Sequence, residues 1–358
     1  MKLFDTATKS CVQFKPTSPV RMYVCGITPD GPPHLGHALT FLTYDLLQRR
    51  LEDMGHQVRL VRNITDVDDP IYVKAAELGI DYRELAKRET AEFKRLMKLL
   101  NLRPPAAEPL ASEYIDEMAR AVGQLLETGH AYRQEGDVYF DVKSFPDFGK
   151  LAGYPRHIML QYMADRGGDP DRPGKRNPFD FLLWKAVTDP ADPAAWPSAV
   201  GYGRPGWHIE CSVMAAAILG APIDIHGGGM DLIFPHHECE LAQTAALGQQ
   251  PLSKLWMHTA PMLQAGEKMS KSLGNLVFVR DLLDQAEPAA LRLALMSYHY
   301  RRGGEWCADF LSEATQLLAE IKQALGRSSG PDPRPYAAKI RAALDDDLNV
   351  PVALQTLR

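Results

Sequence analysis

The sequence is poor in the features that mark secreted, membrane and nucleic-acid-binding proteins. Its five cysteines are scattered and odd in number, which argues against a framework of disulfides and for thiols that are free or bound to a metal. No apolar run approaches the roughly 20 residues of a membrane span, and the first residues lack the apolar core of a secretory signal. We therefore predict a cytoplasmic protein without a membrane partner.

A global basic field is also missing. The 40 basic and 45 acidic residues give a formal net charge of -5, which weakens a polyanion-binding interpretation but leaves room for a local basic patch. Hydrophobic residues make up 45% and charged residues 24% of the 358 positions, an ordinary balance for a globular protein with a sizeable core. This length accommodates two domains, or one large nucleotide-binding domain with insertions.

The N-terminal part of the chain has the pattern of a βαβ unit. Residues 21–25 read as a buried strand, and a loop dense in glycine and proline follows at 26–33. A helix with apolar residues at helical spacing then stops near Gly55, and residues 57–62 read as a second strand. This order predicts a parallel sheet with a ligand at the ends of its strands.

The middle of the chain reads as an insertion between two halves of one fold. Residues 82–133 are helical in pattern, interrupted by a pair of prolines, and residues 137–142 read as a strand. The second half resumes near Trp207, with a strand at 223–226 that ends in three glycines. From Ala289 onward the pattern is helical.

Two short segments suggest a nucleotide triphosphate held from both sides. Residues 33–37 (PHLGH) place His34 and His37 beside a helix start, where backbone N–H groups and imidazoles can stabilise charge on an α-phosphate. In residues 266–275, glycines flank Lys268, Ser270, Lys271 and Ser272, which can close over pyrophosphate as ammonium and hydroxyl donors. Each segment alone is better explained as ordinary surface histidines near a helix start or as a charged loop, and only the pairing gives them weight.

Together the two segments resemble the HIGH and KMSKS motifs of class I aminoacyl-tRNA synthetases. Further segments are similar to cysteinyl-tRNA synthetase and to its close relative, the mycothiol cysteine ligase, and the resemblance covers nearly all of the chain. It implies an α/β fold, with a Rossmann-like parallel-sheet catalytic domain, an insertion and a C-terminal helical domain. The segments are MYVCGIT (22–28), RNITDVDD (62–69), GWHIECS (206–212) and DIHGGGMDLIFPHHE (224–238).

The resemblance also implies domain boundaries. Residues 1–110 would form the first half of the catalytic domain, 111–200 the connective insertion, and 201–250 the second half with a zinc site. Residues 251–305 would form the stem-contact region with the KMSKS loop, and 306–358 an incomplete helical domain.

By the same resemblance, Cys25, Cys211, His236 and Glu240 would bind one zinc ion per chain. His236 and Glu240 are four residues apart and so share a helix face. Zinc suits a cysteine substrate, because a soft thiolate can join the metal whereas the hydroxyl of serine stays protonated. Without the resemblance, each cysteine also reads as a small buried hydrophobe. We rank three neighbours below these ligands: His237, Glu238 and Cys239.

The resemblance assigns substrate contacts as well. Thr28, Thr65 and Trp207 would contact cysteine, although Trp207 also reads as simple core. ATP would bind with Mg²⁺, and the glycines after the strand at 223–226 would let backbone approach the nucleotide. The residues implied for ATP are Gly36, His226, Gly228, Asp231, Ser270 and Lys271, with His34, His37, Lys268 and Lys271 as catalytic groups.

The two branches of the family differ in the acceptor of the activated cysteine. Cysteinyl-adenylate passes its cysteinyl group either to the 3′ end of tRNA(Cys) or to the amine of glucosaminyl-inositol. Residues 166–175 and 299–306 resemble the mycothiol ligase, as does a chain that ends before any anticodon-binding domain. Glu240 and the stretch 236–243 (HHECELAQ) resemble the synthetase instead, and the short chain could reflect truncation.

On this balance the sequence favours a monomeric cysteine–tRNA ligase, with the glucosaminyl-inositol ligase as the alternative. A non-catalytic paralogue that binds nucleotide or tRNA is a third hypothesis. The intact set of His34, His37, Lys268 and Lys271 argues against it, because a decayed site would be expected to lose some of these groups.

Overall fold

A four-stranded parallel sheet forms the centre of the molecule. The computed structural model describes residues 1–270 and 273–357. All three strand pairs of the sheet are parallel, so the strands end at the same edge. In spatial order they are β10 (Trp256–Thr259), β9 (Ile225–Gly229), β3 (Val20–Ile27) and β4 (Val58–Ile64).

The predicted βαβ unit is confirmed. Strand β3 is apolar and almost entirely buried, as expected of a central strand covered on both faces. Helix α1 (Leu35–Asp53) connects it to β4 and begins at an N-cap provided by His34. The helix ends where predicted, since Gly55 adopts a φ of 91°, a left-handed conformation that favours glycine.

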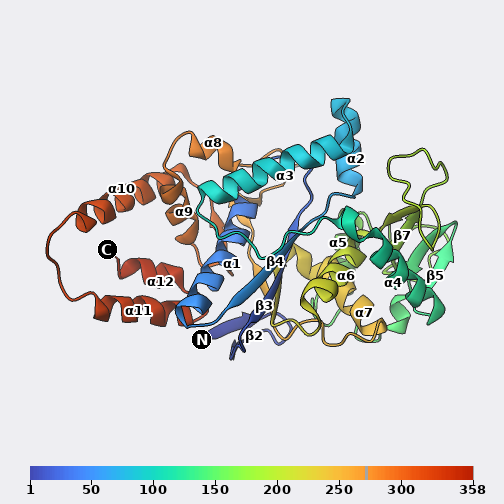
Figure 1. Ribbon diagram of the computed structural model, residues 1–358, viewed down its shortest axis with the longest axis horizontal. Coiled ribbons are helices and arrows are strands. Elements are labelled where there is room, and N and C mark those ends of the chain that lie inside the picture. The colour runs from blue at the N-terminus through green and yellow to red at the C-terminus, as the bar shows by residue number, and fades with distance from the viewer. Residues whose placement is uncertain (271–272, 358) are drawn as a thin grey trace.

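Helices cover both faces of the central sheet (Figure 1). One core joins α1 to helices from the C-terminal part, and a second core lies under α4, α6, α7 and the insertion. The C-terminal helices of the first core are α8 (Val279–Leu283), α9 (Pro288–Met296) and α10 (Ala308–Leu325). Helices α11 (Arg334–Asp345) and α12 (Val350–Gln355) follow them in the chain. The helices of the second core are α4 (Ile115–Glu127), α6 (Trp207–Leu219) and α7 (Glu238–Ala246).

The insertion between β4 and α6 has an antiparallel sheet of its own. The predicted helical stretch 82–133 divides into α3 (Tyr82–Leu99) and α4, as the two prolines require. The insertion also carries α2 (Asp69–Leu78) and α5 (Arg156–Asp165). Its sheet has the order β5 (Ala131–Gln134), β6 (Asp137–Phe140), β7 (Phe181–Ala186) and β8 (Gly203–Pro205).

Short strands complete the fold. They are the hairpin β1 (Lys2–Asp5) and β2 (Ser10–Gln13), and a sheet of β12 (Glu267–Lys268), β11 (Met262–Gln264) and β13 (Gly304–Glu305).

No helix among the described residues is long and apolar enough to cross a membrane. The proposed domain boundaries remain a prediction.

The strand predicted at residues 223–226 is displaced toward the C-terminus. Strand β9 includes the three glycines that we expected to follow it. The reason is the close packing of α1 against the sheet, because a Cβ on Gly227 would lie 2.3 Å from the hydroxyl oxygen of Tyr44. Glycine therefore serves here as a strand residue that lets a helix approach.

Gly26 provides a test of this packing. A Cβ at this position in β3 would lie 1.6 Å from the carbonyl oxygen of Asn63 in β4, so Gly26→Ala must push two central strands apart. We expect the free energy of unfolding to fall by about 3 kcal/mol, measured by urea denaturation. Gly31→Ala is the control, because a Cβ on Gly31 has no atom within 4 Å. Equal stability of the two variants would contradict the strand packing.

Candidate active site

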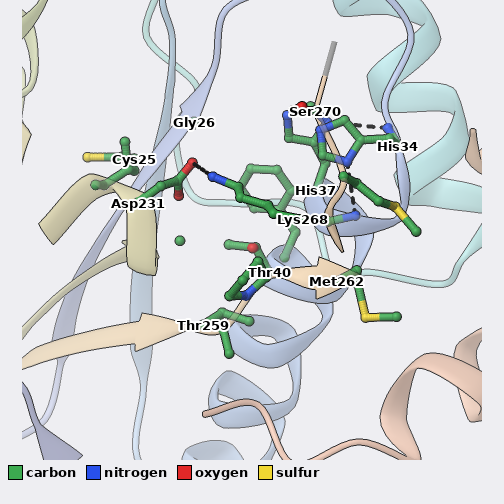
Figure 2. Close-up of a pocket in the computed structure, with 17 residues that line it drawn as sticks. Cys25, Gly26, His34, His37, Thr40, Asp231, Thr259, Met262, Lys268 and Ser270 are labelled. Atoms are coloured by element: carbon green, nitrogen blue, oxygen red, sulfur yellow. Dashed lines mark hydrogen bonds and ion pairs between the residues drawn. The ribbon is translucent and has the colours of Figure 1, made fainter. Parts of the chain in front are cut away.

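The two segments singled out in the sequence line one cavity at the carboxyl ends of the central strands. This first cavity has a volume of about 320 Å³ and lies between the start of α1 and the β11–β12 hairpin. Figure 2 shows Ser270 beside His34 and His37, with the side chain of Lys268 reaching across toward Asp231. Of the predicted ATP contacts, Gly36 and Asp231 also line it. Lys271 lies outside the described residues.

His34 and His37 hold the start of α1 while lining the first cavity. The Nδ1 atom of His34 accepts a hydrogen bond from the Gly36 amide at 3.0 Å, and Nδ1 of His37 accepts one from the His34 amide at 3.3 Å. A neutral ring that accepts at Nδ1 carries its proton on Nε2. The helix start therefore sets both imidazoles as Nε2 donors, the form that a phosphate oxygen can use.

Lys268 and Asp231 form an ion pair across the cavity, with 3.0 Å between Nζ and Oδ2 (Figure 2). Burial opposes ionisation of Asp231, but the ammonium of Lys268, with a smaller effect from Arg166, keeps the pKa of this carboxyl below its usual value. We predicted these residues for pyrophosphate and for ribose. The structure thus brings together two groups expected to contact different parts of ATP.

A buried cluster of side chains that could hold a metal ion adjoins this cavity. The ligand atoms of Cys25, Cys211, His236 and Glu240 all lie within 4.8 Å of one another. The two sulfur atoms are 3.6 Å apart, and Nε2 of His236 is 3.3 Å from Oε1 of Glu240. Strand β3, helix α6, the turn Ile233–His237 and helix α7 supply one residue each. The tertiary fold thus brings together the four ligands that the resemblance implied.

The chemistry of this cluster fits a zinc ion. Nε2 of His236 and Oε2 of Glu240 are buried without a hydrogen-bond partner, although a buried polar atom left unpaired costs about 1–3 kcal/mol. No lysine or arginine among the described residues pairs with Glu240. Burial raises the pKa of the Cys25 thiol and lowers that of His236. A cation at this point would satisfy every one of these groups.

A second set of four residues overlaps the first. Cys25, His226, His237 and Glu240 also place their ligand atoms within 4.8 Å of one another. Nδ1 of His237 bonds to Nε2 of His258 at 2.7 Å, and its Nε2 lies 3.3 Å from the sulfur of Cys25. Nε2 of His236 and Nδ1 of His226 are both buried without a hydrogen-bond partner, so each set contains one such histidine. His237, ranked low from sequence, is therefore close to the cluster.

Two predicted nucleotide contacts are not brought to the first cavity. His226 is fully buried, with Nε2 3.2 Å from Glu240, and its ring is stacked 5.3 Å from that of Tyr23. The amide of Gly228 donates to the hydroxyl of Tyr44 at 2.7 Å. Neither residue is part of the cavity lining. Their assignment to adenosine stays a prediction, and the described geometry places His226 at the metal cluster.

The predicted cysteine contacts divide between two environments. Thr28 and Trp207 line a second cavity of about 460 Å³. The Trp207 ring is stacked on that of His236, with 4.3 Å between centroids. Thr65 is buried and donates to Oε2 of Glu210 at 2.9 Å, and it lines neither cavity. The metal cluster therefore lies between the two cavities, with Cys25 toward the first and Trp207 toward the second.

Several site residues were missed in the sequence. Asp68, Asp69 and Arg204 line the second cavity, and Arg204 forms an ion pair with Asp69. His208 orients the cluster, since its Nδ1 lies 2.9 Å from Nδ1 of His236 and so turns Nε2 toward the other ligands. A signal was present, because both aspartates belong to the segment RNITDVDD and His208 follows Trp207 directly.

Comparison with known proteins identifies the family. The family model for the tRNA synthetases class I (C) catalytic domain matches residues 12–316, and the chain belongs to this family. A curated relative, the L-cysteine:1D-myo-inositol 2-amino-2-deoxy-alpha-D-glucopyranoside ligase of Streptosporangium roseum, is 47% identical over 99% of this chain and 87% of its own length. The protein of the same name from Salinispora arenicola is 48% identical, with the same shares covered.

Solved structures confirm the predicted class I synthetase fold. Mycobacterium tuberculosis methionyl-tRNA synthetase in complex with methionyl-adenylate superposes with a TM-score of 0.65 at 16% identity, covering 95% of this chain and 81% of the other. A putative arginyl tRNA synthetase from Campylobacter jejuni gives a TM-score of 0.59 at 15% identity, covering 96% and 84%. At such low identity these structures show the fold alone.

Our prediction that the cysteinyl group goes to tRNA(Cys) is wrong. Curated relatives with 46–48% identity across 99% of the chain are cysteine ligases for the amino sugar. The synthetase-like stretch HHECELAQ and the carboxylate of Glu240 misled us. Both belong to the buried cluster and to helix α7, and none of their residues lines the second cavity, where residues 166–168 lie.

Proposed function

We propose that this ligase activates L-cysteine with ATP and transfers the cysteinyl group to the amine of glucosaminyl-inositol. The observation that carries the proposal is the position of the buried Cys/His/Glu cluster beside a cavity lined by both nucleotide motifs. The names of the relatives supply the acceptor. A cytoplasmic location and a monomeric state remain predictions.

In the first step, a carboxylate oxygen of cysteine attacks the α-phosphate of ATP and pyrophosphate leaves. His34 and His37 would donate through Nε2 to the phosphate oxygens, because their Nδ1 atoms are occupied by backbone amides. Lys268 would leave Asp231 to neutralise pyrophosphate, and Asp231 would then accept from the ribose hydroxyls. Mg²⁺ would accompany ATP. The residues contribute positioning and charge stabilisation rather than a covalent intermediate.

The buried cluster would select the amino acid. When zinc is bound by Cys25, Cys211, His236 and Glu240, it supplies a position for a thiolate that the protonated hydroxyl of serine does not match. The surrounding residues exclude water and fix the ligands, as His208 does for His236. Trp207 would cover the bound cysteine, since its ring stacks directly on a ligand.

In the second step, the amine nitrogen of the acceptor attacks the acyl carbon of cysteinyl-adenylate. A carbon–nitrogen bond forms, the bond from the acyl carbon to the phosphate oxygen breaks, AMP leaves, and the nitrogen releases one proton. The reaction needs the amino sugar to reach the adenylate from a side that ATP does not occupy.

Two assays test this function. We expect cysteine-dependent ATP–pyrophosphate exchange, and with glucosaminyl-inositol a stoichiometric release of AMP and the amide product by mass spectrometry. Serine should replace cysteine poorly, and tRNA(Cys) should not become acylated. Absence of exchange with zinc present would disprove the activation step and revive the non-catalytic hypothesis. Exchange without amide formation would disprove the acceptor.

A further inference from the structure

The second cavity extends beyond the residues assigned to cysteine, since only Thr28 and Trp207 of its lining have a role in the activation step. It has a volume of about 460 Å³ and lies where the insertion meets the central domain. Its walls come from the loop after β3, the start of α2, the end of α5, strand β7 and the start of α6. The charged groups in these walls are Asp68, Asp69, Asp165, Arg166 and Arg204. This polar lining differs from that of an ordinary packing defect between two domains.

The position of the second cavity suits a second substrate. Trp207 separates it from the metal cluster, with its ring stacked on His236. Cys25, on the opposite side of the cluster, lines the first cavity. A cysteinyl group held at the cluster therefore has the first cavity on one side and the second on the other. A nucleophile in the second cavity could approach the acyl carbon without displacing the nucleotide.

The lining matches the chemistry of an amino polyol. Arg204 is 3% exposed and its guanidinium pairs with Asp69, which also binds Lys185 at 3.1 Å, so charged donors and acceptors for hydroxyls lie side by side in this wall. The Trp207 ring offers an apolar face. Asp68 adds a carboxylate that is fixed by the amide of Asp69 at 2.8 Å. The Asp68 carboxylate can bind an ammonium or amine group.

The surroundings of Asp68 also suit proton exchange near neutral pH. Burial raises the pKa of Asp68 to about 6, against the lowering effect of Arg204, and the carboxylates of Asp69 and Asp30 raise it further. The buried carboxyl of Glu210 also interacts with Asp68. A carboxylate in such surroundings can bind an ammonium group and accept one of its protons.

The loop at 166–175 contributes its first three residues to the wall of this cavity. Arg166, Gly167 and Gly168 line it, and the guanidinium of Arg166 lies 4.7 Å from the centroid of the Tyr162 ring. This loop is one of the two segments whose sequence resembles the mycothiol ligase. The start of this segment, residues 166–168, therefore lies at the same cavity as Thr28 and Trp207.

We propose that the second cavity is the binding site for the amino-sugar acceptor, with Asp68 against its amine. This inference rests on the proposed function. In the transfer step the amine nitrogen bonds to the acyl carbon, AMP leaves with the oxygen of the broken bond, and Asp68 takes the proton released by nitrogen. Arg204, Asp69 and Arg166 bind hydroxyls of the glucosamine and inositol rings.

Asp68→Asn tests this assignment with little disturbance of the fold, because asparagine also caps helices and Asp68 is the N-cap of α2. We expect kcat/KM for glucosaminyl-inositol to fall by about 10- to 100-fold, the effect of losing a charge-assisted hydrogen bond. Cysteine-dependent ATP–pyrophosphate exchange should keep its wild-type kinetics. The control is Asp81→Asn, since Asp81 caps the neighbouring helix α3 from an exposed position outside the cavity.

An analogue makes the test specific for the amine. Glucosyl-inositol has a hydroxyl in place of the amine and should inhibit the wild type and the Asp68→Asn variant with the same inhibition constant. The KM for glucosaminyl-inositol should be higher in the variant than in the wild type. An unchanged KM for the amino sugar in Asp68→Asn, or an equal loss of both ligands, would overturn the role of Asp68. Failure of the wild-type enzyme to form the amide would instead disprove the proposed function itself.

Discussion

We expect Cys211→Ser to reduce cysteine-dependent ATP–pyrophosphate exchange by at least about 100-fold, since even residues that only orient metal ligands contribute 10- to 100-fold. Cys211 lies at the meeting point of four buried elements, with its sulfur 3.6 Å from that of Cys25. A serine hydroxyl would stay protonated and bind zinc poorly. The variant should lose both the metal and its ability to hold the substrate thiol.

Metal content provides a readout independent of activity. Wild-type protein should contain one zinc per chain by elemental analysis, and Cys211→Ser should contain much less after dialysis. Cys239→Ser is a matched control, because Cys239 is equally buried on α7 but lies outside both sets of ligand atoms. Retention of zinc and of exchange in Cys211→Ser would remove this residue from the site, and zinc loss in the control would point to α7 instead.

The second large effect concerns Lys268. We expect Lys268→Met to slow ATP–pyrophosphate exchange by about 100- to 1,000-fold, the usual cost of removing one donor that stabilises developing charge. Its ammonium reaches into the first cavity from the β11–β12 hairpin and forms an ion pair with the carboxylate of Asp231 there. Methionine keeps most of the side-chain length but has no charge for pyrophosphate.

Stability separates this catalytic effect from a structural one. Lys268 and Asp231 are both about half exposed, so their ion pair should contribute less than about 1 kcal/mol to folding. The thermal midpoint of Lys268→Met should therefore equal that of the wild type. Lys322→Met removes an exposed lysine paired with Glu287 on the C-terminal helices and should leave exchange unchanged. Wild-type exchange in Lys268→Met would exclude a role in pyrophosphate release.

The sequence predicted the central fold because its signals are local. The apolar run of β3, the helical spacing of α1 and the stop at Gly55 each depend on neighbouring residues, and all three were confirmed. The strand predicted at 223–226 was misplaced because β9 continues through the three glycines. Only the packing of Tyr44 against Gly227 makes a glycine-rich strand favourable.

The candidate site was predicted in part, through motifs rather than spacing. His34, His37 and Lys268 were found because their segments are distinctive, and they do line one cavity. The acceptor was mispredicted because the residues used to choose it belong to the cysteine cluster. Asp68 and Arg204 are 136 positions apart in the sequence, and no local pattern predicts that they line the same cavity.

The sequence by itself therefore determined the class I fold and the resemblance to enzymes that activate cysteine. Those properties depend on periodicity and on short motifs, which can be recognised from neighbouring residues without knowledge of the tertiary structure. Only the tertiary structure decided that Cys25 and Cys211 meet His236 and Glu240, and that a second polar cavity adjoins Trp207. Such arrangements arise from long-range packing of β3, α6 and α7, because side chains far apart in sequence become neighbours only when the sheet has formed.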